Sequence, residues 1–509
     1  MFFGLASVWA LGSPVLSNSD EPAHSVKAAA LMEGEFVPPK VPLPDDGPGA
    51  LLRGGFTTGV HVPKAYTWQT SKIPLCYIYD AKQSAACAPQ FHADDRPSMW
   101  TTLIGRYPPT YYASVGWVTL LDTGSVGFYS MRLLTAALCA ALLAGALAAA
   151  TTTRRARFMA VGVLLACTPM VFVLAGSINP NAVEAAAGVC AWATLAAALV
   201  HDGRQLPRAL LFGIGASCAL LAVTRPLSTL WLLVIALTVL AALGRWQLLM
   251  TRLREPGVRV VVAAVGVAAA AGAVWTVFSD NLDNNSGYEP RGLDLFHVIK
   301  HSLAITPAYL RQMVAAFGWQ RVEGPWPLAW AWGLVIAVIV VAALRWGGRR
   351  LAVSAVGLLV LVVLTPTILQ APTAGDIGFV WSGRYGLAIA AGVPILAALA
   401  IGSSGRLSAR GMRRLAAGLV GVFAVAQVVA HAASMRRYVV GVRGPLAYFT
   451  GPGWRPPVPT LLLLALVIAF ASGLSVLVYR VATEGDPVAD RVLDDDAPDG
   501  RSGDALVAS

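Results

Sequence analysis

Apolar runs of roughly twenty residues recur along most of this chain, separated by short connections. A run of that length crosses the hydrocarbon core of a bilayer as one α-helix, which satisfies its own backbone groups where no water is present. Only 13% of the 509 residues are charged, whereas soluble proteins have about 25%. The sequence therefore predicts an all-α, polytopic integral membrane protein with about twelve transmembrane helices. We expect these helices near residues 1–17, 128–150, 157–176, 181–200, 208–224, 227–244, 258–278, 327–344, 351–369, 385–402, 412–433 and 459–480.

Arginines gather in the short connections and contribute to a formal net charge of +11. Basic residues in short loops mark the cytoplasmic side of a membrane protein. This distribution argues against nucleic-acid binding and predicts membrane lipids as neighbours. We expect a multi-pass protein of the inner (plasma) membrane with these loops in the cytoplasm. The clusters are Arg154-Arg155-Ala156-Arg157, Arg252-Leu253-Arg254, Arg349-Arg350 and Arg413-Arg414.

The predicted spans divide the chain into four parts. Residues 1–17 are expected to form a first transmembrane helix rather than a removable signal peptide. Residues 18–127 form an extracytoplasmic loop that is far longer than a simple connection. Residues 128–480 form the transmembrane helical bundle. Residues 481–509 form an acidic cytoplasmic tail that is expected to be disordered.

The long first loop has its own predicted organisation. It should open with a helix that Ser19 caps and Gly34 ends. Between Pro38 and Arg106 the loop is rich in Pro, Gly and aromatic residues, and we expect it to be irregular. Residues 113–121 are apolar but too short to span a bilayer, so we expect them to lie along the membrane interface.

Two of the six cysteines, Cys76 and Cys87, lie in this loop. They form a disulfide if the loop faces an oxidising compartment and are otherwise two free thiols. Both alternatives remain open from the sequence. The other four cysteines lie in apolar spans and are expected to be small packing residues.

An acid cluster directly follows the first apolar segment. Asp20 and Glu21 lie at the start of the predicted helix, and His24 shares a helical face with Asp20. An acid at the membrane surface can act as a general base that takes a proton from an acceptor hydroxyl. The alternative is that Asp20 and Glu21 cap the helix and interact favourably with its dipole.

Arginines at the outer ends of two predicted spans are candidates for phosphate binding. Arg225 lies between two apolar spans with almost no loop around it, and Arg384 precedes the tenth span. A guanidinium fork suits phosphate oxygens, but the same residues could anchor the protein to lipid headgroups. Arg132 and Glu184 are expected to pair with each other. His297 and His301, four apart on a predicted helix, give only weak support for a metal site, so we predict hydrogen bonding at the interface instead.

Several short motifs in a fixed order resemble a bacterial membrane-protein family catalogued as domain of unknown function 2142. That family is similar in layout to the GT-C glycosyltransferases. The resemblance implies a polytopic GT-C-like enzyme with an extracytoplasmic active site, which takes a sugar from a polyprenyl-phosphate carrier and inverts its anomeric centre. The motifs are Asp20-Glu21-Pro22-Ala23-His24, Pro108-Pro109-Thr110-Tyr111-Tyr112, Asn179-Pro180-Asn181-Ala182 and Gly383-Arg384-Tyr385.

The resemblance also assigns roles to residues. It implies that Asp20 is the catalytic base, with Glu21 as the second catalytic candidate. The segment Pro108-Pro109-Thr110-Tyr111-Tyr112 would face the lipid carrier. Arg225 and Arg384, at the outer ends of later spans, would hold the carrier phosphate. The implied substrate-binding residues are His24, Tyr111, Tyr112, Arg225, Arg384 and Tyr385.

We therefore expect a membrane glycosyltransferase that transfers a sugar from a polyprenyl-phosphate carrier to a glycan or lipid acceptor of the cell envelope. No cofactor is predicted, and a divalent metal is the less favoured alternative. A transporter or flippase for lipid-linked or anionic envelope precursors is the alternative from another class. The long first loop and the scarcity of ionisable residues at mid-span count against transport. A scaffold within an envelope assembly would leave the acid cluster unexplained.

Overall fold

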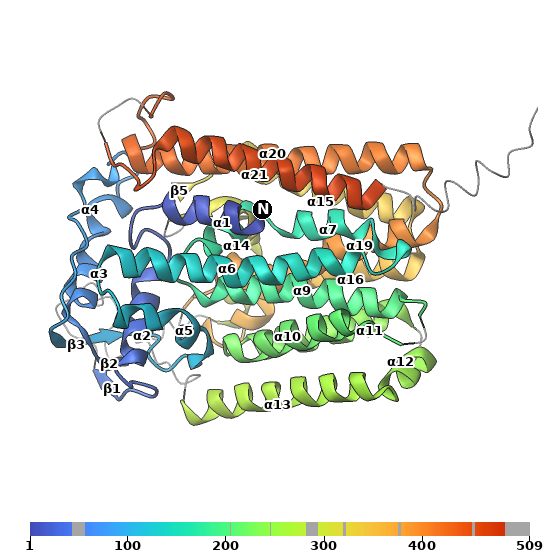
Figure 1. Ribbon diagram of the computed structural model, residues 1–509, viewed down its shortest axis with the longest axis horizontal. Helices are drawn as coiled ribbons and strands as arrows, with labels where there is room; N and C mark the ends of the chain where they lie inside the picture. The colour runs from blue at the N-terminus through green and yellow to red at the C-terminus, as the bar shows by residue number, and fades with distance from the viewer. Residues whose placement is uncertain are drawn as a thin grey trace, which may run out of the picture.

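The computed structural model describes residues 1–42, 56–203, 205–244, 246–280, 294–318, 322–374, 378–449 and 453–483. Long helices lie side by side along the longest axis of the molecule (Figure 1). The short strands and helices of the first loop gather at one end of this bundle, and α12 lies at the other end. The predicted disordered tail lies almost wholly beyond the described residues.

Eight helical segments within the described ranges are long and apolar enough to cross a membrane. Every span predicted from the sequence overlaps a helix, which confirms the polytopic all-α membrane fold. The eight are α6 (Ser125–Ala150), α9 (Pro180–Val200), α13 (Pro256–Phe278), α15 (Trp326–Trp346), α16 (Arg349–Gln370), the continuous segment Gly383–Ser404, α20 (Ala409–Val440) and α21 (Thr460–Thr483). The segment Gly383–Ser404 comprises η5 (Gly383–Gly386), α18 (Leu387–Ala390) and α19 (Gly392–Ser404).

The remaining apolar helices are shorter. They are α1 (Phe2–Leu11), α7 (Met159–Ala166), α8 (Pro169–Ala175), α10 (Arg208–Thr224) and α11 (Ser228–Leu243). Further elements are η4 (Arg154–Ala156), α12 (Trp246–Leu253), the amphipathic α14 (Leu295–Ala315), and the two-stranded β4 (Ala316–Phe317) and β5 (Val322–Glu323).

Two predicted spans differ from the observed helices. The span expected at 1–17 is helical only over Phe2–Leu11, and the chain then runs irregularly to the start of the next helix. The span expected at 157–176 is broken into α7 and α8, with Pro169 at the first position of α8. Side chains bind the backbone at this break, because the Thr168 hydroxyl donates to the Met313 carbonyl (2.7 Å) and Gln427 donates to the Cys167 carbonyl (3.1 Å). Such partners allow a broken helix to lie inside a membrane protein.

Helix α9 is the centre of the bundle. It packs against α6, α10, α11 and α19. Of its most apolar 18-residue stretch, 83% is buried inside the protein. Small side chains let neighbouring backbones approach: a Cβ added to Gly188 would lie 2.8 Å from the Ala388 Cα. The Trp192 indole donates to the Ala388 carbonyl (3.0 Å) and fixes the same contact. By contrast α13 buries only Gly272 and packs mainly on α10, so its other faces meet lipid.

The first loop is more ordered than the sequence indicates. It contains α2 (Glu21–Met32) and an antiparallel sheet in the order β1-β2-β3, in which Val60 of β2 pairs with Trp100 of β3. The irregular structure expected between Pro38 and Arg106 is therefore wrong over the strands. The elements of this region are β1 (Lys40–Pro42), β2 (Phe56–Pro63), η1 (Lys64–Tyr66), α3 (Trp68–Lys72), α4 (Leu75–Ile78), η2 (Ala85–Cys87), β3 (Pro97–Thr102), α5 (Pro109–Gly116) and η3 (Trp117–Leu120).

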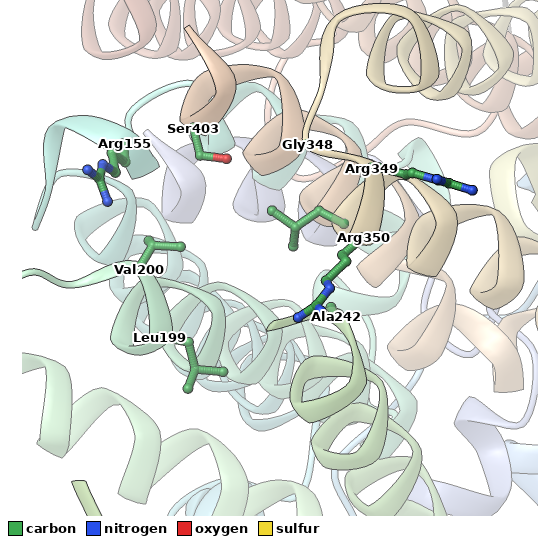
Figure 2. Close-up of a pocket in the computed structure, with 9 residues that line it drawn as sticks. Arg155, Leu199, Val200, Ala242, Gly348, Arg349, Arg350 and Ser403 are labelled. Carbon is green, nitrogen blue, oxygen red and sulfur yellow. The ribbon is translucent and has the colours of Figure 1, made fainter. Parts of the chain in front are cut away.

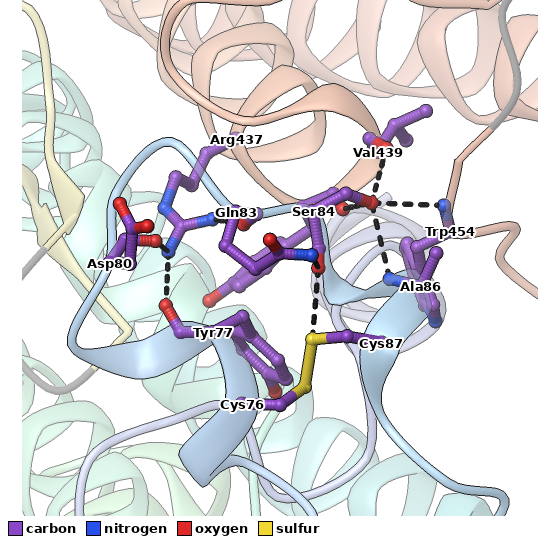
Figure 3. Close-up of a disulfide and its surroundings, with 11 residues drawn as sticks. Cys76, Tyr77, Asp80, Gln83, Ser84, Ala86, Cys87, Arg437, Val439 and Trp454 are labelled. Atoms are coloured by element: carbon purple, nitrogen blue, oxygen red, sulfur yellow. Dashed lines mark hydrogen bonds between the residues drawn. A yellow bond between two sulfur atoms is a disulfide. The ribbon is translucent and has the colours of Figure 1, made fainter.

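A disulfide closes the segment between α4 and η2. Cys76 and Cys87 are bonded, with their Cα atoms 6.1 Å apart (Figure 3). The buried Arg437 guanidinium of α20 donates to the carbonyl oxygens of this segment, including those of Tyr77 and Gln83 (2.6 Å each). The Ser84 hydroxyl donates to the Val439 carbonyl (2.6 Å). The disulfide segment is thereby fixed to the end of α20.

Candidate active site

A buried ion pair joins the acid cluster to the bundle. Both oxygens of Glu21 accept from Arg132, at 2.8 Å from Nε and 2.6 Å from Nη2, and neither side chain has exposed surface. The remaining N–H groups of Arg132 donate to the carbonyls of Ala10, Ser13 and Pro14 (2.7–2.8 Å). All five donors of the guanidinium are therefore satisfied. Glu21, the predicted second catalytic acid, is buried with both carboxylate oxygens bonded to Arg132, so this geometry gives it a structural role.

A second buried pair lies at the start of α9. Arg225 donates from Nη1 to Glu184 (2.7 Å) and to Asn181 Oδ1 (2.6 Å). The other oxygen of Glu184 accepts from the Ser228 hydroxyl (2.6 Å). The expected pairing of Arg132 with Glu184 is wrong, because each residue has a different partner on a nearer element.

The motif around Asn179 connects the start of α9 to the segment that carries Asp20 and Glu21. The Asn179 side chain caps α9 by accepting from the Asn181 backbone N–H (3.0 Å), and Pro180 occupies the first turn. The Asn179 amide also donates to the Ser19 carbonyl (3.1 Å). This hydrogen bond positions the residue that precedes Asp20 directly over the N-terminus of α9.

Asp20 occupies the N-cap position of α2 but does not cap the helix. Its backbone is left-handed (φ 62°), a region that a residue other than glycine adopts infrequently. Its side chain makes no capping hydrogen bond and instead accepts from Nη2 of Arg384. The Asp20 side chain is 39% exposed, while that of Arg384 is only 4% exposed. The predictions that Asp20 or Ser19 caps the helix are therefore wrong, whereas Glu21 does lie in its first turn. Asp20 presents an accessible carboxylate beside a buried cation.

Arg384 is held by the helix that packs behind it. The Gly383 backbone N–H donates to Gln312 of α14 (2.7 Å), which fixes η5 against that helix. The Nε and Nη1 atoms of Arg384 are buried and have no hydrogen-bond partner among the described residues. The Nε atom of Arg225 is in the same condition. Buried guanidinium nitrogens without partners are costly, so these atoms are suited to an anion.

The ring of Tyr385 links the two arginines. The Arg225 Cζ lies 4.8 Å from its centroid and the Arg384 Cζ lies 5.2 Å from it. Both distances are within the range of cation–π attraction. Tyr385 therefore keeps two like charges close together while leaving their unpartnered N–H groups available.

His24 and the tyrosines of α5 form the wall beside Asp20. His24 Nδ1 lies 2.8 Å from the Tyr112 hydroxyl, and both side chains are buried. Tyr111 bonds Thr135 of α6 through its hydroxyl (2.9 Å) and is also buried. Of these predicted substrate-binding residues, the two tyrosines brace α2 and α6 rather than presenting open surface. Residues 117–121 after α5 expose Trp117, Leu120 and Leu121, an apolar surface suited to a membrane interface.

Electrostatics keep His24 neutral at physiological pH. Burial lowers the pKa of His24 to about 3. The negative charge of Asp20 partly opposes this shift, and the positive charges of Arg225 and Arg384 reinforce it. Four of the predicted residues thus share one electrostatic neighbourhood.

Tyr107 was not predicted as a site residue. Its ring centroid lies 6.3 Å from that of His24. Burial raises the pKa of Tyr107. Its position directly before the Pro108-Pro109 motif is the sequence signal that could have identified it.

The predicted residues do not all converge. Asp20, His24, Arg225, Arg384 and Tyr385 come together, whereas Glu21 belongs to the separate pair with Arg132. His297 and His301 stack with their ring centroids 6.2 Å apart on α14. In the described part of the chain, no three His, Cys, Asp or Glu side chains are arranged to hold a metal ion.

The chain matches the sequence model of a family described as "Predicted membrane protein (DUF2142)" over residues 2–393. No curated protein matches it. Similar solved structures include two crystal structures of ArnT from Cupriavidus metallidurans. The one bound to undecaprenyl phosphate has 16% identity and a TM-score of 0.44, and the match covers 95% of this chain and 76% of that chain. The apo structure has 15% identity and a TM-score of 0.42, covering 94% and 74%. Similarity this low leaves the site to be argued from its own residues.

Glu21→Gln tests the structural role of the buried pair. The substitution leaves the Arg132 charge without a carboxylate, so we expect a loss of about 3–5 kcal/mol in the free energy of unfolding. Thermal unfolding of the purified protein in detergent measures this as a large fall in Tm. The control is Glu33→Gln, which changes an exposed acid at the other end of α2 and should leave Tm unchanged. An unaltered Tm for Glu21→Gln, with activity lost, would instead support Glu21 as a catalytic acid.

The low pKa of His24 predicts acid sensitivity. Between pH 6.5 and about 3, the unfolded chain binds a proton at this histidine that the folded protein does not. Stability from this group is therefore complete above pH 6.5 and decreases as the pH falls, by up to about 1.4 kcal/mol per pH unit. His24→Asn should flatten the dependence of Tm on pH between 6.5 and 4.5, and the exposed control His92→Asn should not. Equal slopes for wild type and His24→Asn would refute this account.

Proposed function

This chain belongs to the DUF2142 family of predicted membrane proteins, and we propose that it is an inverting membrane glycosyltransferase. In this proposal it transfers a sugar from a polyprenyl-phosphate carrier to a glycan or lipid acceptor of the cell envelope. The observation that carries the proposal is the Asp20–Arg384 pair, in which a half-exposed carboxylate contacts a buried guanidinium that has unpartnered donors. The GT-C-like order of the motifs directs this chemistry toward glycosyl transfer.

The arginines supply the phosphate site. The unpartnered nitrogens of Arg384 and Arg225 can donate to the phosphate oxygens of the carrier. The incoming phosphate then competes with Asp20 for Arg384. Donor binding weakens the Asp20–Arg384 pair and frees the Asp20 carboxylate at the moment when a substrate is present.

The reaction follows from this exchange. An acceptor hydroxyl approaches the anomeric carbon from the face opposite the phosphate, and Asp20 removes its proton as the new C–O bond forms. The bond between the anomeric carbon and the phosphate oxygen breaks, and the electron pair leaves with the polyprenyl phosphate. The two arginines stabilise the growing negative charge on this leaving group. Glu21 acts as a positioning residue, because its pair with Arg132 holds the start of α2.

The orientation of the site is part of the proposal. Arginine-rich connections mark one end of the bundle as cytoplasmic. The disulfide lies with the first loop at the opposite end (Figure 1), and disulfides persist in oxidising compartments outside the cytoplasm. Both arguments support an extracytoplasmic position for Asp20 at the plasma membrane.

Asp20→Asn gives the sharpest test of the proposed base. We expect transfer to fall by about 10²–10⁴-fold, because the amide cannot accept the proton. Binding of a polyprenyl phosphate should become tighter, because Arg384 loses its competing carboxylate. Arg384→Gln should weaken binding of the same lipid. Transfer is measured with radiolabelled polyprenyl-phosphate sugars, and binding with the unglycosylated carrier.

The control for this test is Asp94→Asn, which removes an acid that pairs with Arg96 on the surface of the same loop. It should change neither transfer nor binding. Full transfer by Asp20→Asn would exclude Asp20 as the base. Loss of carrier binding in Asp20→Asn would exclude the competition for Arg384. Movement of a lipid-linked sugar across proteoliposomes without transfer would favour a flippase.

Thiol labelling tests the orientation. A membrane-impermeant maleimide should label Cys76 and Cys87 in intact cells only after reduction of the disulfide. In a Cys76→Ser/Cys87→Ser background, Arg410→Cys reports the opposite end and should be labelled only after the cells are permeabilised. Labelling of Arg410→Cys in intact cells, with protection of the reduced loop cysteines, would reverse the proposed orientation.

A further inference from the structure

A cavity lined by arginines lies at the end of the bundle opposite Asp20. Its volume is about 410 Å³ (Figure 2). It lies where the C-terminal ends of α9, α11 and α19 meet η4 and the N-terminus of α16. The lining residues are Arg155, Leu199, Val200, Ala242, Gly348, Arg349, Arg350, Leu351 and Ser403.

The rim of this cavity carries an excess of positive charge. Arg155 and Arg350 lie on opposite sides of it, with Arg349 beside Arg350 (Figure 2). Arg155 pairs with Asp202 at 3.1 Å. Arg350 donates one N–H to the Gly244 carbonyl (3.2 Å), and in the described part of the chain neither Arg349 nor Arg350 forms an ion pair. Of these three arginines, only Arg155 has a carboxylate partner in the described part of the chain, and the Arg349 side chain points away from the hollow in Figure 2.

The floor of the cavity is apolar. Val200, Ala242 and Leu351 are buried, and Leu199 is half-buried beside them. These residues end or begin helices whose other turns lie within the predicted membrane region. A ligand that fills the cavity must place an anionic group between the arginines and apolar atoms on the floor.

Helix ends also meet at the cavity. Gly348 is the N-cap of α16 and provides no side chain, and no side chain caps the first turn. The positive end of the helix dipole thus lies at the cavity beside Arg349 and Arg350. The C-terminal ends of α9, α11 and α19 lie at the same cavity with the opposite sign, so the arginines, and not the helix dipoles, supply its positive charge.

We propose that this cavity binds one anionic glycerophospholipid of the cytoplasmic leaflet. The phosphate lies between Arg155 and Arg350, and the glycerol and first acyl carbons cover Val200 and Ala242. Basic pockets between transmembrane helices on the cytoplasmic side suit such headgroups. A soluble phosphate could pair with the arginines, but it would leave the apolar side chains of the floor exposed to water. The site shares no lining residue with the proposed active site, so the inference is independent of the transfer reaction.

Native mass spectrometry of the delipidated full-length protein tests the proposal. Phosphatidylglycerol and phosphatidylcholine with identical acyl chains are added separately at a small molar excess. We expect the wild-type protein to retain one phosphatidylglycerol, with about ten-fold preference over phosphatidylcholine. Arg349→Gln/Arg350→Gln should lose this preference, and Arg349→Lys/Arg350→Lys, which keeps the charge, should retain most of it.

The matched control is Arg413→Gln/Arg414→Gln, which removes two exposed arginines on α20 at the same end without touching the cavity. It should retain phosphatidylglycerol as the wild type does. An equal loss in this control would show that general surface charge, not the cavity, holds the lipid. Unchanged retention in Arg349→Gln/Arg350→Gln would overturn the site.

Competition with inorganic phosphate distinguishes a lipid site from a site for a soluble anion. If millimolar phosphate displaces the retained lipid, the cavity binds a soluble anion and the lipid assignment is wrong. Each single arginine variant is measured beside the double variant, so the test does not depend on one protein folding. Size-exclusion profiles confirm that the compared variants are equally monodisperse.

Discussion

The buried pair of Glu21 and Arg132 is the contact on which the proposed active site depends. Arg132 donates to the carbonyl of Ala10 at the end of α1, to two carbonyls of the irregular segment after it, and to both oxygens of Glu21. Removing two charges from water is expensive, and only such complete hydrogen bonding offsets the cost. The pair therefore fixes residues 12–21 in one conformation on the bundle. Asp20 is presented at the site because its neighbour on the chain cannot move.

The same segment explains why adjacent acids have different surroundings. Asp20 adopts a left-handed backbone, which turns its side chain away from the first turn of α2 and toward Arg384. Glu21, one residue later, points into the core. Strained backbone at a single non-glycine position persists only where the surrounding contacts determine it. Here Arg132 on one side and the Asn179 amide on the other supply those contacts.

The sequence predicted the helices well because lipid leaves few alternatives to helix for a long apolar run. Ten of the twelve predicted spans match helical segments, and the spans at 1–17 and 157–176 are only partly helical or broken. The sequence also identified Asp20, His24, Arg225 and Arg384 as candidates, and the fold brings them together. The sequence could not predict ion-pair partners, because these depend on which helices are neighbours. Arg132 and Glu184 both needed a partner, but each found it on a different element. The sequence also could not predict the helix break at Thr168. The Thr168 hydroxyl donates its hydrogen bond to the carbonyl of Met313, which is far along the chain.

The two arginine sites differ in a way that follows from burial. Arg384 is almost wholly buried and has donors with no partner, so its environment favours an anion that reaches it directly. Arg349 and Arg350 are exposed, so solvent can form hydrogen bonds with their guanidinium groups. Binding at the exposed site must therefore draw on the apolar floor as well as on charge. A phosphate on a lipid meets both conditions, which is why we propose a lipid at this site. This difference in burial is the reason that we propose chemistry on a carrier at one end of the bundle and association with the surrounding membrane at the other.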